Sequence, residues 1–397
     1  MLVQFSFKNV LSFKDETILD MTAVNAYKEH LTNVICSETK EKFLKVAAIY
    51  GANASGKSNL NLAMNYFQHI IIESFNNVDK EEKKAIEKYY KPFLFDGDNA
   101  NSEFQIIEIL DGFEYKYGFE YNADCIVGEW LYRKNLKTNR NTILLERENN
   151  KIEFGATVRK ECETYQGQIP TETLALSFFN KLKLNTDIFN VVYNGIMDTL
   201  VAGADFYQNN WILHQMLPKV VDNDKSQLID FLVAIDTGIK DIRYEKEGDK
   251  IKFFTSHADR YGNLYDMNLF NESAGTIKSI IVYMYAKLAI RGNKSMFVDE
   301  LNVKLHPLLL KFIIDLFYDE KSTAQLIYTT HDTTLMDKKF FRRDQIWFVQ
   351  KDEFGYSELS ALSDFKVRSD ASFEKDYLAG VYGGIPLLKE LNVKEGE

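Results

Sequence analysis

Residues 51–58, Gly-Ala-Asn-Ala-Ser-Gly-Lys-Ser, match the phosphate-binding pattern GxxxxGK[ST] at each fixed position. An apolar strand is predicted before them and a helix after them, which is the context that such a loop needs. Two glycines permit backbone angles and a close approach that a Cβ would forbid. The N–H groups of the loop and of the helix N-terminus then favour an anion. The residues expected to bind the nucleotide are Gly51, Ala52, Asn53, Ala54, Ser55, Gly56, Lys57, Ser58 and Asn59.

The last residues of this loop indicate which phosphate chemistry it serves. Lys57 would place a positive charge on the β- and γ-phosphates of ATP, and Ser58 would offer its hydroxyl group to Mg²⁺. The alternative is a glycine turn followed by an exposed lysine. The flanking strand and helix favour the phosphate loop, so the expected cofactors are ATP and Mg²⁺.

A second segment, 295–300 (Ser-Met-Phe-Val-Asp-Glu), reads as a buried strand that ends in two carboxylates. Asp299 would lie at the tip of the strand as a Mg²⁺ ligand, acting through water. Glu300 would orient or deprotonate the attacking water. Because an acidic pair after an apolar strand is common, this segment alone does not decide the function.

Two more polar residues, Ser273 and His331, lie at the ends of predicted elements, where each could contact a phosphate. Ser273 and Gly275 precede a helix predicted over 276–291, whose N-terminus would favour a phosphate. The alternative for this segment is a simple helix cap. His331 ends a predicted strand and would contact the γ-phosphate; the alternative is a buried core histidine. The four elements occur together in this order, which favours a composite ATPase site with Glu300, His331 and Lys57 as catalytic residues.

The predicted elements would position these residues in an α/β fold. Strands are predicted in residues 1–50 and 240–270, an antiparallel sheet over 103–155, and helices over 171–236. From residue 276 helices alternate with strands, which implies a parallel sheet covered by helices. We therefore expect lobe I at 1–165, a projecting helical insertion at 166–238 and lobe II at 239–397.

The order of the motifs GANASGKS, ESAGT, VDELNVKLHP and TTHD resembles ABC-type ATPases related to the structural-maintenance-of-chromosomes (SMC) and RecF proteins. Within that group, the segments NVLSFKDE, YKPFLF, EWLY, DQIWFVQKD and YLAGVYGGIP are similar to the prokaryotic RloA and abortive-infection (AbiL-like) ATPases. The resemblance implies a two-lobed P-loop ATPase head with a mixed β-sheet, an antiparallel β subdomain and a helical insertion. It also implies an anti-phage role beside a separately encoded effector.

The resemblance further implies that two heads enclose two ATP molecules, each site completed by Ser273 of the other copy. The expected partners are therefore a second copy, in an ATP-dependent homodimer or higher oligomer, a separately encoded effector or toxin, and a phage-derived trigger. The segment ESAGT departs from the LSGGQ form of transporters. The glutamine that couples Mg²⁺ to an inserted domain is not evident either: Gln105 is a candidate, although it also reads as an ordinary strand residue.

Composition and charge bound the remaining alternatives. The 397 residues carry a formal net charge of −10, which gives no bulk attraction to nucleic acid. A basic cluster (Arg133, Lys134, Lys137, Arg140 and Arg147) leaves nucleic-acid binding open. The alternatives are a DNA-clamping repair or chromosome ATPase and an ATP-locked scaffold with negligible turnover.

We expect a cytoplasmic chain, because no signal peptide and no apolar run of the ~20 residues needed to cross a bilayer is seen.

Overall fold

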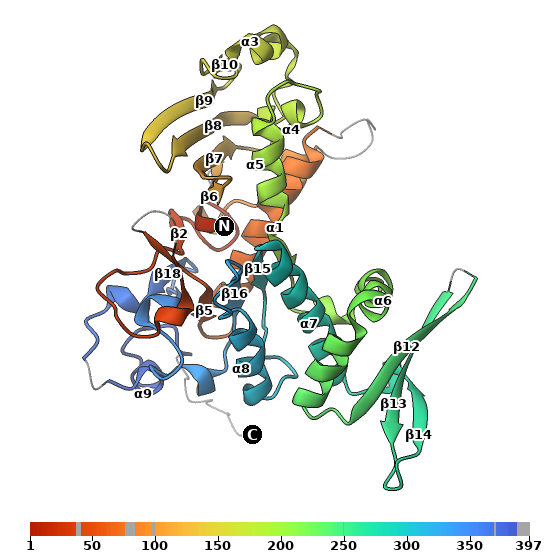
Figure 1. Cartoon of the computed structure of the whole chain (residues 1–397). Helices are drawn as coiled ribbons and strands as arrows, with labels where there is room; N and C mark the ends of the chain where they lie inside the picture. The colour runs from red at the N-terminus through yellow and green to blue at the C-terminus, as the bar shows by residue number, and fades with distance from the viewer. Residues whose placement is uncertain (37–40, 76–83, 97–99, 249, 369–370, 387–397) are drawn as a thin grey trace, which may run out of the picture.

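The computed structural model of the chain describes residues 1–36, 41–75, 84–96, 100–248, 250–368 and 371–386, and two large β-sheets dominate this part (Figure 1). The first sheet is antiparallel. Its strands, in spatial order, are β10 (Lys151–Phe154), β9 (Arg140–Glu148), β8 (Ile126–Asn135), β7 (Phe113–Tyr121), β6 (Ser102–Leu110), β1 (Leu2–Lys8) and β2 (Thr17–Asp20). The antiparallel sheet predicted over 103–155 is confirmed, and two N-terminal strands extend it.

The second sheet is the core of the molecule. Its strands, in spatial order, are β11 (Leu200–Ala202), β15 (Ser295–Val298), β16 (Gln325–Thr329), β5 (Val46–Tyr50), β17 (Ile346–Lys351) and β18 (Ser357–Ala361). The first five run parallel, and β18 is an antiparallel edge strand. The predicted alternation of helices and strands thus gives the expected parallel sheet, and β16 lies between β5 and β15.

Apolar cores pack on both faces of the parallel sheet. Along β5, Ala47 and Ile49 point into one core, while Val46, Ala48 and Tyr50 point into the other. A strand covered on both faces reads as a continuous apolar run, which explains the sequence of β5.

Helices cover both faces of this sheet. Helix α1 (Lys57–Glu73) fills the first core, between the parallel and the antiparallel sheet. The opposite face is covered by α6 (Asn210–Ala234), α7 (Ala274–Gly292) and α8 (Pro307–Leu316).

The other described elements include a hairpin, further α-helices and a third sheet. A hairpin pairs β3 (Val34–Cys36) with β4 (Lys42–Leu44). The remaining α-helices are α2 (Ala85–Tyr89), α3 (Arg159–Cys162), α4 (Ala175–Asn180), α5 (Ile188–Met197) and α9 (Phe373–Leu378). The strands predicted at 240–270 are β12 (Ile239–Glu247), β13 (Lys250–Ala258) and β14 (Leu264–Asn268), and they form a sheet that extends away from the body beside α6 (Figure 1).

The segment 166–238 differs from the projecting insertion that its helical pattern predicts. Phe189 and Val192 of α5 are buried in the core under the antiparallel sheet, and β11 pairs with β15. The apolar faces of these helices need burial, and the body of the molecule provides it. The part that projects is instead the sheet β12–β14. The domain limits remain a prediction, and residues 387–397 of lobe II lie outside the described part.

Arg147 of the predicted basic cluster lies inside the molecule. Arg147 is only 5% exposed and donates to the carbonyl oxygens of Thr173, Pro170 and Thr171, so it does not belong to a basic surface. In the described ranges, no helix has the length and apolar character that a bilayer crossing requires.

Gln325 of β16 links the N-terminal strand to the core sheet, and this contact predicts a stability effect. Its fully buried amide accepts from Leu2 N (2.7 Å) and donates to the carbonyl oxygens of Leu2 (2.9 Å) and Leu44 (3.1 Å). Gln325→Leu would leave these buried groups unpaired and should lower the free energy of unfolding by about 2–3 kcal/mol. Urea denaturation measures the change. Gln168→Leu, at an exposed position, is the matched control, and equal effects of the two changes would contradict the prediction.

Candidate functional site

The parallel register brings the predicted site residues to one edge of the core sheet. Strands β5, β16 and β15 are hydrogen-bonded neighbours with the same direction, so their carboxyl ends lie side by side. The loop 51–56 follows β5, the pair Asp299–Glu300 follows β15, and His331 follows β16. The carboxyl edge of such a sheet is where ligands bind in α/β proteins.

The phosphate loop has a conformation that only a few residue types can adopt. Gly56 has φ 116°, and a Cβ on it would lie 2.4 Å from Ser357 Oγ and 2.9 Å from Ser12 Oγ. Ser357 Oγ also lies 2.6 Å from the carbonyl oxygen of Ser55 and 2.7 Å from Ser12 Oγ. Two serines from distant segments therefore support the back of the loop, and the sequence carried no signal for either.

Lys57, the first residue of α1, folds back over its own loop. Its Nζ donates to the carbonyl oxygens of Gly51 (2.7 Å) and Ala52 (2.8 Å), and the residue is 6% exposed. Burial lowers the pKa of Lys57, while the nearby carboxylates of Glu300 and Asp299 oppose that shift. The loop lysine and the acidic pair therefore share one electrostatic environment, as the motif order predicts.

Thr329 at the end of β16 organises the acidic pair. Its Oγ1 donates to Asp299 Oδ1 (2.5 Å) and accepts from the backbone N–H of Glu300 (2.8 Å). Asp299 is 4% exposed, and Glu300 adopts a left-handed φ of 48°. Thr329 is not among the residues predicted from the sequence, and its one available signal is a polar side chain at the carboxyl end of a buried strand, two residues before His331.

His331 is exposed rather than buried in the core, so the alternative of a satisfied core histidine does not hold. Its Nε2 lies 3.4 Å from Asn302 Nδ2. Asn302 Oδ1 and Ser55 Oγ are buried and have no hydrogen-bond partner among the described residues. Buried polar atoms are normally paired, so these orphaned atoms at the loop and the acidic segment fit a site that accepts a polar ligand.

Ser273 is the N-cap of α7. Its Oγ accepts from Thr276 N at 3.0 Å and the residue is exposed, so the simple helix cap is what the chain shows. A Cβ on Gly275 would lie 2.8 Å from the carbonyl oxygen of Lys304, which packs the start of α7 tightly onto the segment after the acidic pair. Because Ser273 faces solvent at a helix N-terminus, a phosphate of another copy could approach it.

The donors for a metal ion are few. Ser58 is exposed at the start of α1, and Asp299 lies at the end of β15. Within the described ranges, no group of three or more His, Cys, Asp or Glu residues could hold a metal by itself. This donor set fits Mg²⁺, which usually takes one or two protein ligands and completes its octahedron with water and phosphate oxygens.

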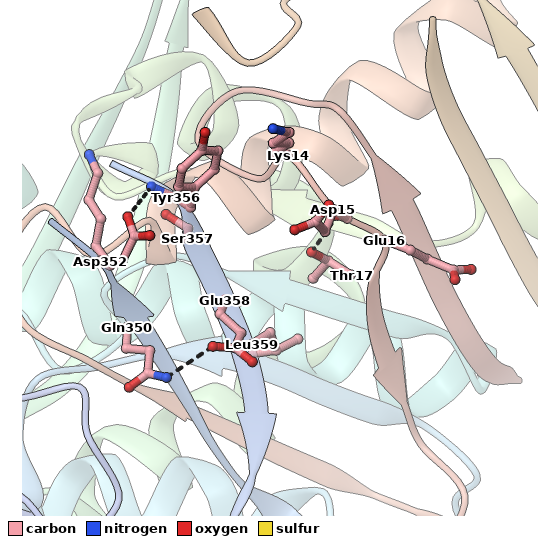
Figure 2. Close-up of a pocket in the computed structure, with 11 residues that line it drawn as sticks. Lys14, Asp15, Glu16, Thr17, Gln350, Asp352, Tyr356, Ser357, Glu358 and Leu359 are labelled. Carbon is pink, nitrogen blue, oxygen red and sulfur yellow. Dashed lines mark hydrogen bonds between the residues drawn. The ribbon is translucent and has the colours of Figure 1, made fainter. Parts of the chain in front are cut away.

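One cavity adjoins the phosphate loop, and a second is lined in part by Ser357, which contacts the loop. The first, of about 770 Å³, is lined by loop residues 52–55, by 350–352 and by the glycine-rich segments 379–380 and 383–386. The second, of about 650 Å³, lies between residues 14–17 and the β17–β18 hairpin, and Figure 2 shows Ser357 in its wall. Both volumes lie in the range of small-molecule pockets.

Gln105, the candidate coupling glutamine, lies on β6 within the antiparallel sheet. Its Oε1 accepts from Trp130 Nε1 at 3.1 Å, and its Nε2 lies 3.5 Å from Ser6 Oγ. These contacts are those of an ordinary strand residue.

Residues 46–337 match the family described as "AAA domain, putative AbiEii toxin, Type IV TA system". Among solved structures, the chain is similar to an SMC head bound to the C-winged helix domain of ScpA, with 13% identity, a TM-score of 0.45, and coverage of 95% of this chain and 99% of that chain. It is also similar to the SMC head domain from Thermotoga maritima, with 13% identity, a TM-score of 0.42, and coverage of 91% and 98%. No curated protein matches.

Substitution of Gly56 tests the loop geometry. Gly56→Ala would strain a positive φ and push the new Cβ against Ser357 and Ser12, so the loop N–H groups should lose their alignment. We expect the affinity for ATP, measured by calorimetry, to fall by about tenfold or more, since ~1.4 kcal/mol of distortion suffices.

Gly167→Ala is the control, because nothing lies within 4 Å of its new Cβ. Unchanged ATP affinity in Gly56→Ala would show that the loop does not bind the phosphates.

Proposed function

The chain belongs to this AAA-domain family, and from that premise we propose that it is an ATP-binding and ATP-hydrolysing molecular switch. The observation that carries the proposal is the convergence of the phosphate loop, the Asp299–Glu300 pair and His331 at one edge of the sheet. Each of these groups supplies a different part of a phosphoryl-transfer site.

Each residue of the site would have a role that follows from the chemistry of its side chain or backbone. The N–H groups of loop 51–56 and the ammonium group of Lys57 would hold the phosphates, and Lys57 must leave the carbonyl oxygens of Gly51 and Ala52 to do so. Ser58 and Asp299 would hold Mg²⁺, which supplies charge neutralisation at the phosphates. Glu300 would orient or deprotonate a water, and His331 would contact the terminal phosphate from the neighbouring strand.

We further propose that two copies enclose the nucleotides between them. The support is the exposed Ser273 at the N-terminus of α7, where helix N–H groups and the helix dipole favour a phosphate. ATP would then hold the two copies together, and hydrolysis would release them. Closure of such a dimer changes which surfaces each copy presents, and this is how a switch acts on a partner.

The partner that we propose is a separately encoded toxic effector of an anti-phage, abortive-infection system, released or activated when a phage-derived trigger is sensed. This proposal rests on the resemblance to RloA and AbiL-like ATPases. Among the described residues, no group of three or more His, Cys, Asp or Glu side chains could hold a metal ion.

Glu300→Gln tests the hydrolytic role. The change keeps the size of the side chain but removes the carboxylate that would activate water, so kcat should fall by about 100-fold or more while ATP affinity is retained. Phosphate release and equilibrium ATP binding measure the two quantities. Glu320→Gln, at an exposed position, is the control. A Glu300→Gln variant with wild-type turnover would remove Glu300 from the mechanism.

Light scattering tests the two-copy arrangement. With Mg-ATP, Glu300→Gln should double in mass, because binding without turnover traps the closed form. Adding Ser273→Arg should keep it monomeric, since a bulky side chain would block approach of the other copy's phosphates. A constant multimeric mass with and without ATP would favour a preassembled scaffold instead.

A further inference from the structure

Lys278 is a fully buried lysine on α7, five residues after Ser273. An ammonium group away from water is costly unless it is hydrogen-bonded and electrostatically matched. The hydrogen-bond and electrostatic partners of its ammonium group therefore indicate the role of Lys278.

The ammonium group of Lys278 is bonded to the acidic segment of the candidate site. Its Nζ donates to the backbone carbonyl oxygen of Glu300 at 2.9 Å. On another side it lies 5.2 Å from the ring centroid of Tyr207 and 5.9 Å from that of Phe206, within the range of cation–π attraction. The ammonium group of Lys278 thus lies between the rings of Tyr207 and Phe206 and the carbonyl oxygen of Glu300.

Burial and the nearby charges act on Lys278 in opposite directions. Burial lowers the pKa of Lys278 to about 8, and the nearby carboxylates of Glu300, Asp205 and Asp299 oppose the shift, while Lys304 adds to it. In its ammonium form, Lys278 makes a charge-assisted hydrogen bond to the carbonyl oxygen of Glu300, which is stronger than a neutral one.

Glu300 needs such support because its backbone is in an unfavourable region. Its φ of 48° is left-handed, a conformation that a residue with a Cβ adopts only when its surroundings impose it. Thr329 Oγ1 accepts from the N–H of Glu300 at 2.8 Å, and Lys278 holds its carbonyl oxygen. The two contacts fix the residue from both sides and so set the direction of its side chain.

The same helix carries the end that would meet the other copy. Ser273 and Lys278 lie about 7.5 Å apart along the helix axis, at ~1.5 Å per residue. Between them, Gly275 packs on the carbonyl oxygen of Lys304 so closely that a Cβ would be 2.8 Å away. Helix α7 therefore contacts the segment that begins with Asp299 at two positions, Gly275 and Lys278.

We propose that Lys278 is a positioning residue that holds the backbone of Glu300 in its hydrolytic conformation and links it to the position of helix α7. The proposal rests on the proposed ATPase function. Lys278 would not touch the nucleotide. It would act through Glu300, so a shift of α7 on docking of the second copy would displace Glu300 in the chain's own site.

Lys278→Met tests this role, because methionine fills a similar volume without the donor or the charge. We expect ATP affinity to stay within about threefold of wild type and kcat to fall by about 10- to 100-fold, the loss typical of a misplaced catalytic group. Lys278→Arg, which keeps charge and donors, should recover part of the rate. Lys287→Met, on the same helix and half-buried, is the matched control and should be unchanged.

A second measurement needs no nucleotide. Hydrogen–deuterium exchange of the segment 299–305 should be faster in Lys278→Met than in wild type and in Lys287→Met, because the peptide of Glu300 has lost its anchor. If Lys278→Met does not fold, Lys278→Gln, which keeps a shorter N–H donor, takes its place with an intermediate effect expected.

The outcomes separate the two proposals. A folded Lys278→Met or Lys278→Gln variant that turns over ATP at the wild-type rate, or shows unchanged exchange at 299–305, overturns the role of Lys278. A wild-type protein that binds but does not hydrolyse ATP overturns the proposed function, and the exchange comparison then still decides whether Lys278 anchors Glu300.

Discussion

The shared register of three parallel strands is the constraint on which the candidate site depends. Strand β16 is hydrogen-bonded to β5 on one side and to β15 on the other, so the ends of all three strands are fixed at one edge. No single segment contains the site. Loop 51–56, Asp299 and His331 are neighbours only because the backbone ladder aligns them. A slip by one residue would turn every side chain of the strand to the opposite face, and the cores on both faces prevent it.

Balanced charge is the second feature of that edge. Two lysines, Lys57 and Lys278, approach the pair Asp299–Glu300 from α1 and α7, and burial lowers the pKa of both. Each ammonium group finds backbone carbonyl oxygens rather than a carboxylate as its hydrogen-bond partner. The two lysines therefore act on the carboxylates through space, while Thr329 Oγ1 donates directly to Asp299 Oδ1. Such an arrangement suits a site that must receive a metal ion and a highly charged ligand.

Local patterns were sufficient to predict much of this protein. The phosphate-loop motif, the apolar strands that end in polar residues, and the alternation of helices and strands from residue 276 predicted the parallel sheet and three of the site's segments. Contacts that join distant segments could not be predicted. Ser357 lies on β18 and reaches the phosphate loop only because β18 pairs with β17 and β17 pairs with β5, and Lys278 reads as a surface lysine until the helix is packed. The short strand β11 was missed because three residues carry too little periodicity to be distinguished from a helical stretch.

The position of β5 in the chain also has a consequence for biosynthesis. The side chain of Gln345 bonds to the carbonyl oxygen of Val46, 299 positions earlier, and both sheet neighbours of β5, β16 and β17, come from the segment 325–351. At ~5–20 residues per second, a ribosome needs about 15–60 s to make the intervening segment. During that interval an apolar strand has no partner edge and needs protection from aggregation. Assembly of this edge of the sheet is therefore a late event, completed only after residues 325–351 have been translated.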